Sequence, residues 1–252
     1  MPLTTHDDHL LAPFDEADRA ALVDMAARRR MTVEDFVVAA VRAYMVPTTD
    51  LGVEVAALGE HVVQPPLERL PLALRLPVRL AGGTQRLLWM AAGRGRYRLG
   101  AGLLSNGRLR LGGPGRIQVG RDVNAWARSG SNRLTTFRAE AVIVVGDRVR
   151  LNGAGIQAAT RVEVGDDTIL GSCTIVDTDH HTVAPEDRRE GAAATRPIRI
   201  GRNVWIGGAV VLKGVSVGDN SVIGLGSVVT DDVPANVVMA GNPARIVRRF
   251  EA

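Results

Sequence analysis

A short polar run in the second half of the chain carries residue types that could transfer protons. It consists of Asp177-Thr178-Asp179-His180-His181 and holds two of the five histidines of the chain. Imidazole, with an ordinary pKa near ~6.5, takes up and releases a proton readily at neutral pH. The two carboxylates could orient or polarise a histidine, or they could be solvated residues of a turn. The run is therefore a candidate site for acid–base chemistry.

Two other kinds of chemistry have little support in the sequence. Cys173 is the only cysteine, which excludes an intrachain disulfide and a cysteine-based zinc cluster. It is also a poor candidate for an acyl-carrying nucleophile, because it lies within a regular repeat where a small buried residue is expected. The histidines are His6, His9, His61, His180 and His181. A three-histidine zinc site, as in a γ-type carbonic anhydrase, has too few ligands in the repeat region, so we expect no metal.

An internal repeat sets the elements that must position the polar run. An aliphatic residue followed by glycine recurs along the second half of the chain, often at six-residue spacing, as at Val164 and Leu170 or Ile200 and Ile206. Neither the 3.6-residue period of a helix nor the two-residue period of a strand accounts for this spacing. One short strand and one turn per repeat does account for it. The aliphatic side chain then points into a three-sided prism, and Gly, Asn and Asp occupy turns where a positive φ is often needed.

The repeat predicts a stacked solenoid with about five coils between about residues 109 and 233. Two polar segments, 126–140 and 177–197, interrupt the six-residue register. We expect both to be external loops, which commonly carry function on a rigid scaffold. The second loop begins with the polar run described above, at the exit from a coil.

The N-terminal part of the chain has a different composition. Residues 1–50 contain helix-start signals and helical spacing, and they predict a small helical region. Residues 51–100 are expected to be a proline- and arginine-rich connector with early strands. Ten arginines and no acidic residue lie between Arg75 and Arg121, and several of them alternate with apolar residues. This alternation predicts strands with a basic outer face, which could meet an anionic substrate, a polysaccharide or a membrane, or could simply be solvated.

The overall composition limits the class of protein. The 252 residues are 46% hydrophobic and only 4% aromatic, which excludes a disordered chain and indicates a core of small aliphatic side chains. With no leader and no long apolar run, we expect a cytoplasmic protein without a membrane span. We expect no nucleic-acid partner, although Arg28-Arg29-Arg30 beside the predicted helices leaves a ribbon-helix-helix-like DNA-binding unit as a weaker hypothesis.

From about residue 142 to 250 the sequence carries four motifs in a specific order. They are Ile198-Arg-Ile-Gly-Arg-Asn-Val-Trp-Ile-Gly-Gly208, Gly214-Val-Ser-Val-Gly-Asp-Asn220, Gly226-Ser-Val-Val-Thr230 and Gly241-Asn-Pro-Ala-Arg245. This segment resembles the hexapeptide-repeat acetyltransferases, and among them the sugar O-acetyltransferases of the galactoside, maltose, nodulation-factor and exopolysaccharide type. The resemblance implies a mainly β protein whose residues 101–252 form a left-handed parallel β-helix acyltransferase domain. It also implies a homotrimer with active sites between neighbouring subunits, and acetyl-CoA as co-substrate.

The resemblance also assigns the catalytic histidine. It points to His181, with the adjacent His180 as the alternative. The histidine would act as general base on the acceptor hydroxyl and would return the proton to the departing thiolate. The acetyl group would pass directly, without an acyl-enzyme, and backbone N–H groups near Trp205–Gly208 would stabilise the oxyanion.

The remaining assignments concern the two substrates. The cofactor-binding candidates are Trp205, Gly208, Leu225, Thr230, Arg245 and Arg248. The two arginines suit the nucleotide phosphates as charge-assisted donors, whereas Trp205 is either a wall of the site or a packing residue between subunits. The acceptor-binding candidates are Asn152, Asp177, Asp179 and Arg188. Asn152 could instead occupy a left-handed turn, and Arg188 could be a surface residue only.

The sequence departs from the galactoside enzymes in two respects. Those enzymes have an asparagine and an aspartate in the coil before the catalytic histidine, where this chain has Leu151 or Asn152, and Ala159. Their short N-terminal region is replaced by about a hundred residues that do not resemble it. We therefore expect a saccharide or glycosylated metabolite other than a simple galactoside as acceptor. Two alternatives remain: an N-acetyltransferase acting on an amino sugar or an antibiotic, and a non-catalytic β-helical scaffold with a partner-binding helical N-terminus.

Overall fold

The computed structural model of the protein describes residues 72–127 and 130–251, together with Val23 and Ala27. The helical region expected over residues 1–50 lies outside the described residues, apart from those two isolated positions. The chain divides into two compact units, the first of which ends at Gln85, and every described strand belongs to the second.

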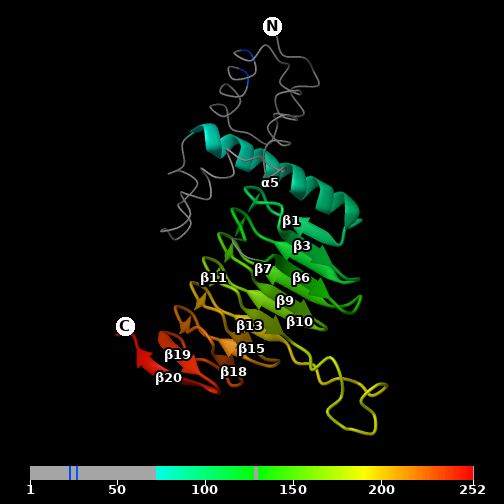
Figure 1. Cartoon of the computed structure of the whole chain (residues 1–252), viewed down its shortest axis with the longest axis vertical. Coiled ribbons are helices and arrows are strands. Elements are labelled where there is room, and N and C mark those ends of the chain that lie inside the picture. Colours follow the sequence, from blue (N-terminus) through cyan, green and yellow to red (C-terminus); the bar gives the residue numbers. More distant parts are fainter. Residues whose placement is uncertain (1–22, 24–26, 28–71, 128–129, 252) are drawn as a thin grey trace. The chain divides into compact units, whose positions relative to one another are not determined.

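The second unit, Arg86–Ala252, is a left-handed parallel β-helix of about seven turns (Figure 1). Its strands form three sheets, termed A, B and C, which the chain visits in turn. Sheet A contains β1 (Tyr97–Leu99), β4 (Arg116–Val119), β7 (Val142–Val145), β10 (Arg161–Val164), β13 (Ile198–Ile200) and β16 (Ser216–Val217). Sheet B contains β2 (Leu104–Ser105), β5 (Asn124–Ala125), β8 (Arg150–Leu151), β11 (Ile169–Leu170), β14 (Trp205–Ile206), β17 (Val222–Ile223), β19 (Val237–Gly241) and β20 (Ala244–Arg249). Sheet C contains β3 (Leu109–Gly112), β6 (Asn132–Thr136), β9 (Gly155–Ala158), β12 (Thr174–Val176), β15 (Val210–Val211) and β18 (Val228–Val229).

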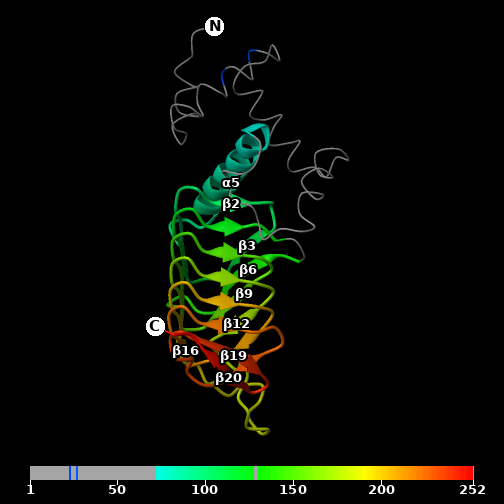
Figure 2. The same ribbon diagram turned by 90° about the vertical axis from the view of Figure 1, so that its left-hand side faces the viewer.

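Columns of aliphatic side chains fill the interior of the β-helix, one residue from each coil. In sheet A, Ile117 pairs with Ile143, Ile143 with Val162, and Val162 with Ile198, and none of the four is more than 1% exposed. Successive strands lie about 4.8 Å apart, so each column stacks aliphatic groups in direct contact. Figure 2 shows the same stacking for the strands of sheet C, from β3 to β12. The mainly β, β-helical fold predicted from the sequence is confirmed.

The β-helix starts earlier and has more turns than predicted. We expected about five coils from about residue 109, whereas β1 begins at Tyr97 and about seven turns follow. Tyr97 pairs with Ile117, so this first coil is longer than three hexapeptides and hides the repeat. The basic alternation predicted here is confirmed, because Arg98 and Arg110 are exposed between buried neighbours on the same strands.

In the expected connector and early strands over residues 51–100, positions 51–71 lie outside the described residues, and the rest differs in part from the expectation. The segment Leu72–Ala92 is a helix, α5, which ends shortly before β1. Most of its residues are Leu, Ala or Arg, all strong helix formers, and they outweigh Pro77, which we expected to interrupt regular structure. Within the second unit, the end of α5 contacts the first coil, where Arg86 Nε donates a 2.7 Å hydrogen bond to the carbonyl oxygen of Leu99.

Only one of the two expected external loops is a loop throughout. Residues 177–197 lie between β12 and β13, outside the strands, as predicted. Residues 126–140, in contrast, contain β6, which pairs with β3 on one side and with β9 on the other. Extra residues precede and follow β6, so the six-residue register is lost although the strand keeps its place in sheet C.

The glycine that follows the aliphatic residue at the corner between sheets A and B is required for a reason other than the one we expected. The left-handed φ does not fall on Gly165 or Gly201 but two residues later, on Asp167 (61°) and Asn203 (53°). A Cβ placed on Gly165 would lie 2.6 Å from the carbonyl oxygen of Gly201 in the next coil. The backbones of successive coils therefore approach so closely at this point that only glycine fits.

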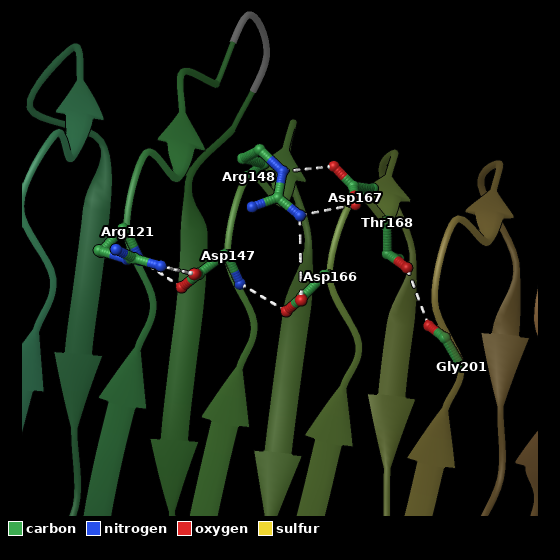
Figure 3. Close-up of polar contacts among 7 residues, drawn as sticks. All are labelled: Arg121, Asp147, Arg148, Asp166, Asp167, Thr168 and Gly201. Atoms are coloured by element: carbon green, nitrogen blue, oxygen red, sulfur yellow. Dashed lines mark hydrogen bonds and ion pairs between the residues drawn. The ribbon is translucent and has the colours of Figure 1, made fainter.

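Polar contacts join successive coils at the corner between sheets A and B (Figure 3). The Asp147 carboxylate accepts hydrogen bonds from the backbone N–H of Arg121 (2.8 Å) and from its guanidinium (3.0 Å), and both hold the pKa of Asp147 below its ordinary value. In the following coil Asp166 accepts from the Asp147 N–H, and Asp167 pairs with Arg148 at 2.7 Å. Each turn is thus held by the carboxylates of its neighbour, which makes the stack a rigid support for the loop that leaves it.

Candidate functional site

The long loop between β12 and β13 leaves the β-helix at the corner between sheets C and A, termed the C–A corner. An antiparallel bridge between Thr178 and Thr195 closes its base. The backbone N–H of Arg196 donates to the Asp177 carbonyl oxygen (3.0 Å), and Gly214 of the next coil donates to the Arg196 carbonyl oxygen (3.1 Å). The base of the loop is therefore attached firmly to the coils, whereas its tip extends away from them (Figure 1).

Asp177, the first residue of the loop, has its side chain turned into the β-helix. Its side chain is completely buried, at 0% exposure. Its carboxylate accepts hydrogen bonds of 2.6 to 2.8 Å from the backbone N–H groups of Ala159, Thr160 and Arg161, and another from the Thr160 hydroxyl. These groups form the C–A turn of the preceding coil. Asp177 thus anchors that turn, and a role in binding the acceptor stays a prediction.

Asp179 forms an ion pair with Lys213, the only lysine of the chain. The Lys213 Nζ lies 2.5 Å from Asp179 Oδ1, and both side chains are mostly shielded from solvent. The Asp179 backbone donates to the Ala194 carbonyl (3.1 Å) and accepts from the His181 N–H (2.7 Å). Lys213 therefore holds the turn that carries the histidines. Sequence reasoning missed this residue, although its being the sole lysine was an available signal.

His180 and His181 are both exposed on this turn. His180 has a left-handed backbone (φ 63°), and its N–H donates to Thr178 Oγ1 at 3.1 Å. The His180 ring packs edge-on against Phe137, with 5.0 Å between ring centroids. Phe137 follows β6 directly, and it was missed because its segment was expected to be an external loop. Arg188 is exposed farther along the same loop as the histidines.

Three other predicted residues lie at the corner between sheets B and C, termed the B–C corner. Asn152 and Gly208 are half-buried there, whereas Leu225 is 84% exposed. A Cβ on Gly208 would lie 2.6 Å from Leu225 Cδ1, and the Gly226 N–H donates to the Gly208 carbonyl at 2.8 Å. Trp205 lies near this corner on the outer face of β14 and is 55% exposed. These residues form a continuous open surface around the corner.

The last three predicted residues are near the C-terminal end of the β-helix. Thr230 follows β18 at the C–A corner, and its hydroxyl donates to Asp231 Oδ2 at 3.0 Å. The guanidinium of Arg245 lies 3.7 Å from the same carboxylate oxygen. Arg248 is on β20, where its guanidinium carbon is 5.6 Å from the centre of the Phe250 ring. The structure therefore does not bring all of the cofactor-binding candidates to one place.

The candidate residues instead form two groups on opposite edges of sheet C. The C–A corner carries the two histidines, Asp179 and Lys213, and the B–C corner carries Asn152, Gly208 and Leu225. Gly208 precedes β15 and Lys213 follows it, and the two residues are five positions apart. At about 3.3 Å per residue the two edges are roughly 16 Å apart. Within one chain, the histidines and the B–C corner therefore do not meet.

Cys173 lies inside the β-helix and is 3% exposed, as the repeat predicted. Burial raises the pKa of its thiol to about 12, so the thiol is protonated at neutral pH. In the part of the chain that the structure describes, no three His, Cys, Asp or Glu side chains cluster in a way that could hold a metal ion. No helix in the same residues has the length and apolarity needed to cross a membrane.

Comparisons with known proteins show what this chain is similar to. Residues 197–231 match the family described as bacterial transferase hexapeptide (six repeats). A galactoside O-acetyltransferase of Escherichia coli K12 is 48% identical over 90 residues, which cover 35% of this chain and 44% of that protein. A galactoside O-acetyltransferase of Lactococcus lactis is 44% identical over 92 residues, covering 36% and 44% of the two chains. These matches confirm the resemblance to hexapeptide-repeat acetyltransferases that the motifs predicted.

These matches cover only part of each relative. This chain spans less than half of the length of either relative. A solved structure of an N-acyltransferase from Bacillus cereus, AntD, in complex with dTDP and coenzyme A has a TM-score of 0.51 with this chain. It is 14% identical and covers 64% of this chain and 88% of its own, so it supports the fold alone.

Proposed function

We propose that this chain is an acetyl-CoA-dependent O-acetyltransferase that acts on a hydroxyl of a saccharide or glycosylated metabolite. The hexapeptide match over residues 197–231 and the similarity to two galactoside O-acetyltransferases support an acetyl transfer. The observation that carries the proposal is the exposed His180–His181 turn, held at the C–A corner by the Lys213–Asp179 ion pair. An exposed imidazole is a suitable base for an alcohol acceptor, because the hydroxyl proton must be removed as the oxygen attacks.

His181 serves as the general base in this proposal. The His180 ring is packed against Phe137, which leaves the neighbouring imidazole of His181 to face an acceptor. His181 removes the hydroxyl proton as the acceptor oxygen bonds to the thioester carbonyl carbon. When the tetrahedral intermediate collapses, the carbon–sulfur bond breaks and His181 returns the proton to the thiolate. The acetyl group is thus transferred directly, without an acyl-enzyme.

A backbone N–H near Trp205–Gly208 stabilises the oxyanion. The N–H groups of Trp205 and Gly207 already donate to the carbonyls of Ser221 and Ile223 in the next coil, each at 2.9 Å. The Gly208 N–H lies outside these ladder bonds, so we assign the oxyanion donor to it. A preorganised donor of this kind contributes about 10²–10³-fold to the rate.

The complete site requires two chains. The histidines and the Gly208 corner lie roughly 16 Å apart on one chain, so a homotrimer in which these two edges of neighbouring subunits meet would complete the site. In this arrangement the pantetheine of acetyl-CoA runs along Trp205, Gly208 and Leu225. Arg245 and Arg248 would then bind the nucleotide phosphates as charge-assisted donors.

Acetyl-CoA consumption measured against a panel of neutral sugars, amino sugars and glycosylated metabolites tests the proposed function. We expect turnover with hydroxyl acceptors. Preferred acetylation of amines would replace the proposal with an N-acetyltransferase. A chain that neither binds nor consumes acetyl-CoA would overturn the enzyme hypothesis and favour a non-catalytic β-helical scaffold.

Replacing Cys173 with alanine separates direct transfer from an acyl-enzyme. We expect kcat to change by less than about twofold, because the thiol is buried and protonated and touches neither substrate. Thermal unfolding measures the loss of stability caused by the small cavity that the substitution leaves. Loss of activity without loss of stability, or a covalent acetyl group on Cys173 detected by mass spectrometry, would contradict direct transfer.

A further inference from the structure

The outer face of sheet C carries a basic hollow that the proposed chemistry does not use. It has a volume of about 580 Å³ and is lined by Arg108, Arg110 and Arg133 together with the small or polar residues Gly112, Ser131 and Thr135. Arg110 on β3 and Arg133 on β6 are directly opposite each other in the parallel pairing of these strands. Figure 2 shows the two strands as neighbours in the stack.

The two opposed arginines are not balanced by acidic groups. Both side chains are exposed, and neither takes part in an ion pair between described residues. Among the described residues, Arg110 donates to the backbone carbonyls of Gly107 (2.7 Å) and Leu109 (3.3 Å). Like charges that face each other across a strand pair destabilise a sheet. Arg121 and Arg148 on this β-helix have carboxylate partners, whereas Arg110 and Arg133 face each other with no such partner among the described residues.

The hollow lies on the same strand that reaches the histidine turn. Arg133 and Thr135 lie on the outer face of β6, and Phe137, which follows the strand directly, continues the same alternation. Phe137 contacts the His180 ring. At about 3.3 Å per residue, the Arg133 backbone is roughly 13 Å from Phe137. A saccharide of two or three units could therefore reach from the hollow to the histidines.

We propose that the hollow is an acceptor subsite for an anionic saccharide, in which Arg110 and Arg133 bind a carboxylate, sulfate or phosphate on a unit near the one that is acetylated. Two guanidinium groups on neighbouring strands can bind the oxygens of one such anion through charge-assisted hydrogen bonds. The bound anion also removes the repulsion between the two arginines. The link to acetylation rests on the proposed function, whereas anion binding can be tested without it.

Binding is measured by calorimetry on the full chain without acetyl-CoA. The probes are hexameric oligogalacturonate and a sulfated heparin hexasaccharide, with a neutral galacto-oligosaccharide of equal length as reference. We expect at least one anionic probe to bind more tightly than the neutral one, and to lose affinity as NaCl rises. The double variant Arg110→Gln/Arg133→Gln should weaken that binding about tenfold. The matched control Arg98→Gln removes an exposed arginine from sheet A and should have no effect.

The double variant should also unfold at the same or a higher temperature, because it removes a like-charge pair. Loss of stability together with loss of binding would mean that the arginines are structural, and would overturn the proposal. Equal affinity for anionic and neutral probes would overturn it as well, as would weakened binding of coenzyme A by the double variant. Anion binding by a chain that shows no acetyl transfer would support this subsite while contradicting the proposed function.

Discussion

Replacing His181 with alanine is expected to lower kcat for acetyl transfer by about 10²–10⁴-fold, because the acceptor hydroxyl then loses its general base. The affinity for acetyl-CoA should not change, since the substitution leaves in place the residues proposed to bind it, which are Trp205, Gly208 and Leu225 for the pantetheine and Arg245 and Arg248 for the phosphates. Steady-state rates with the best acceptor of the panel give kcat, and calorimetry with coenzyme A gives the dissociation constant. A loss in kcat at constant coenzyme A affinity identifies an interaction made in the transition state.

His180→Ala is the matched control for this prediction. It removes the adjacent imidazole and the contact with Phe137, and it leaves the ion pair between Lys213 and Asp179 in place. We expect a loss of less than about tenfold in kcat, because the change disturbs the turn without removing the base. If His180→Ala abolishes activity and His181→Ala does not, the two roles are reversed. If neither variant loses activity, a histidine base is excluded.

Replacing Asp177 with alanine is expected to lower the free energy of unfolding by about 3–5 kcal/mol. Its carboxylate is completely buried and accepts three backbone hydrogen bonds and one from a hydroxyl. Removing it leaves these donors in the C–A turn without a partner, and each buried unsatisfied donor costs about 1–3 kcal/mol. Urea unfolding followed by circular dichroism measures the effect. Acetyl transfer by the protein that remains folded should also fall, because the loop that carries the histidines begins at Asp177 and loses its anchor.

Asp187→Ala provides the comparison, because Asp187 lies on the exposed part of the same loop. Surface substitutions of this kind change stability by less than about 0.5 kcal/mol. Equal stability of the two variants would contradict an anchoring role for Asp177. If Asp177→Ala kept the stability of the unmodified chain but lost activity, an acceptor contact would have to be reconsidered.

The solenoid was predictable because its signal is local. An inward aliphatic residue recurs about once per six residues, and each coil has a glycine at the corner between sheets A and B, where the next backbone approaches. The pair Gly165 and Gly201 illustrates this, since the spacing was evident while its cause was not. A turn conformation and a close contact between coils both select glycine. Only the stacked structure distinguishes them, by placing a carbonyl oxygen where the Cβ would be.

Interruptions of the repeat were harder to interpret, because an insertion hides a strand whose partners are far away in sequence. β6 keeps its place through pairing with β3 and β9, and these contacts have no six-residue signature. Because β6 was not predicted, Phe137 was not predicted to lie in the candidate site either. For the same reason Lys213 was missed, since its partner Asp179 lies in the preceding coil.

The sequence by itself determined the class of fold, the position of the long loop and the two histidines at its start. It could not separate Asp177 from Asp179, two carboxylates in one polar run with the same chemistry. The tertiary structure decided this. Asp177 continues the inward alternation of β12 into a turn where three N–H groups converge, whereas Asp179 lies beyond the coil and meets a lysine. The physical reason is that the burial of each carboxylate and its hydrogen-bonding partners depend on residues in neighbouring coils. No local sequence pattern shows which residues of the neighbouring coil will lie beside it.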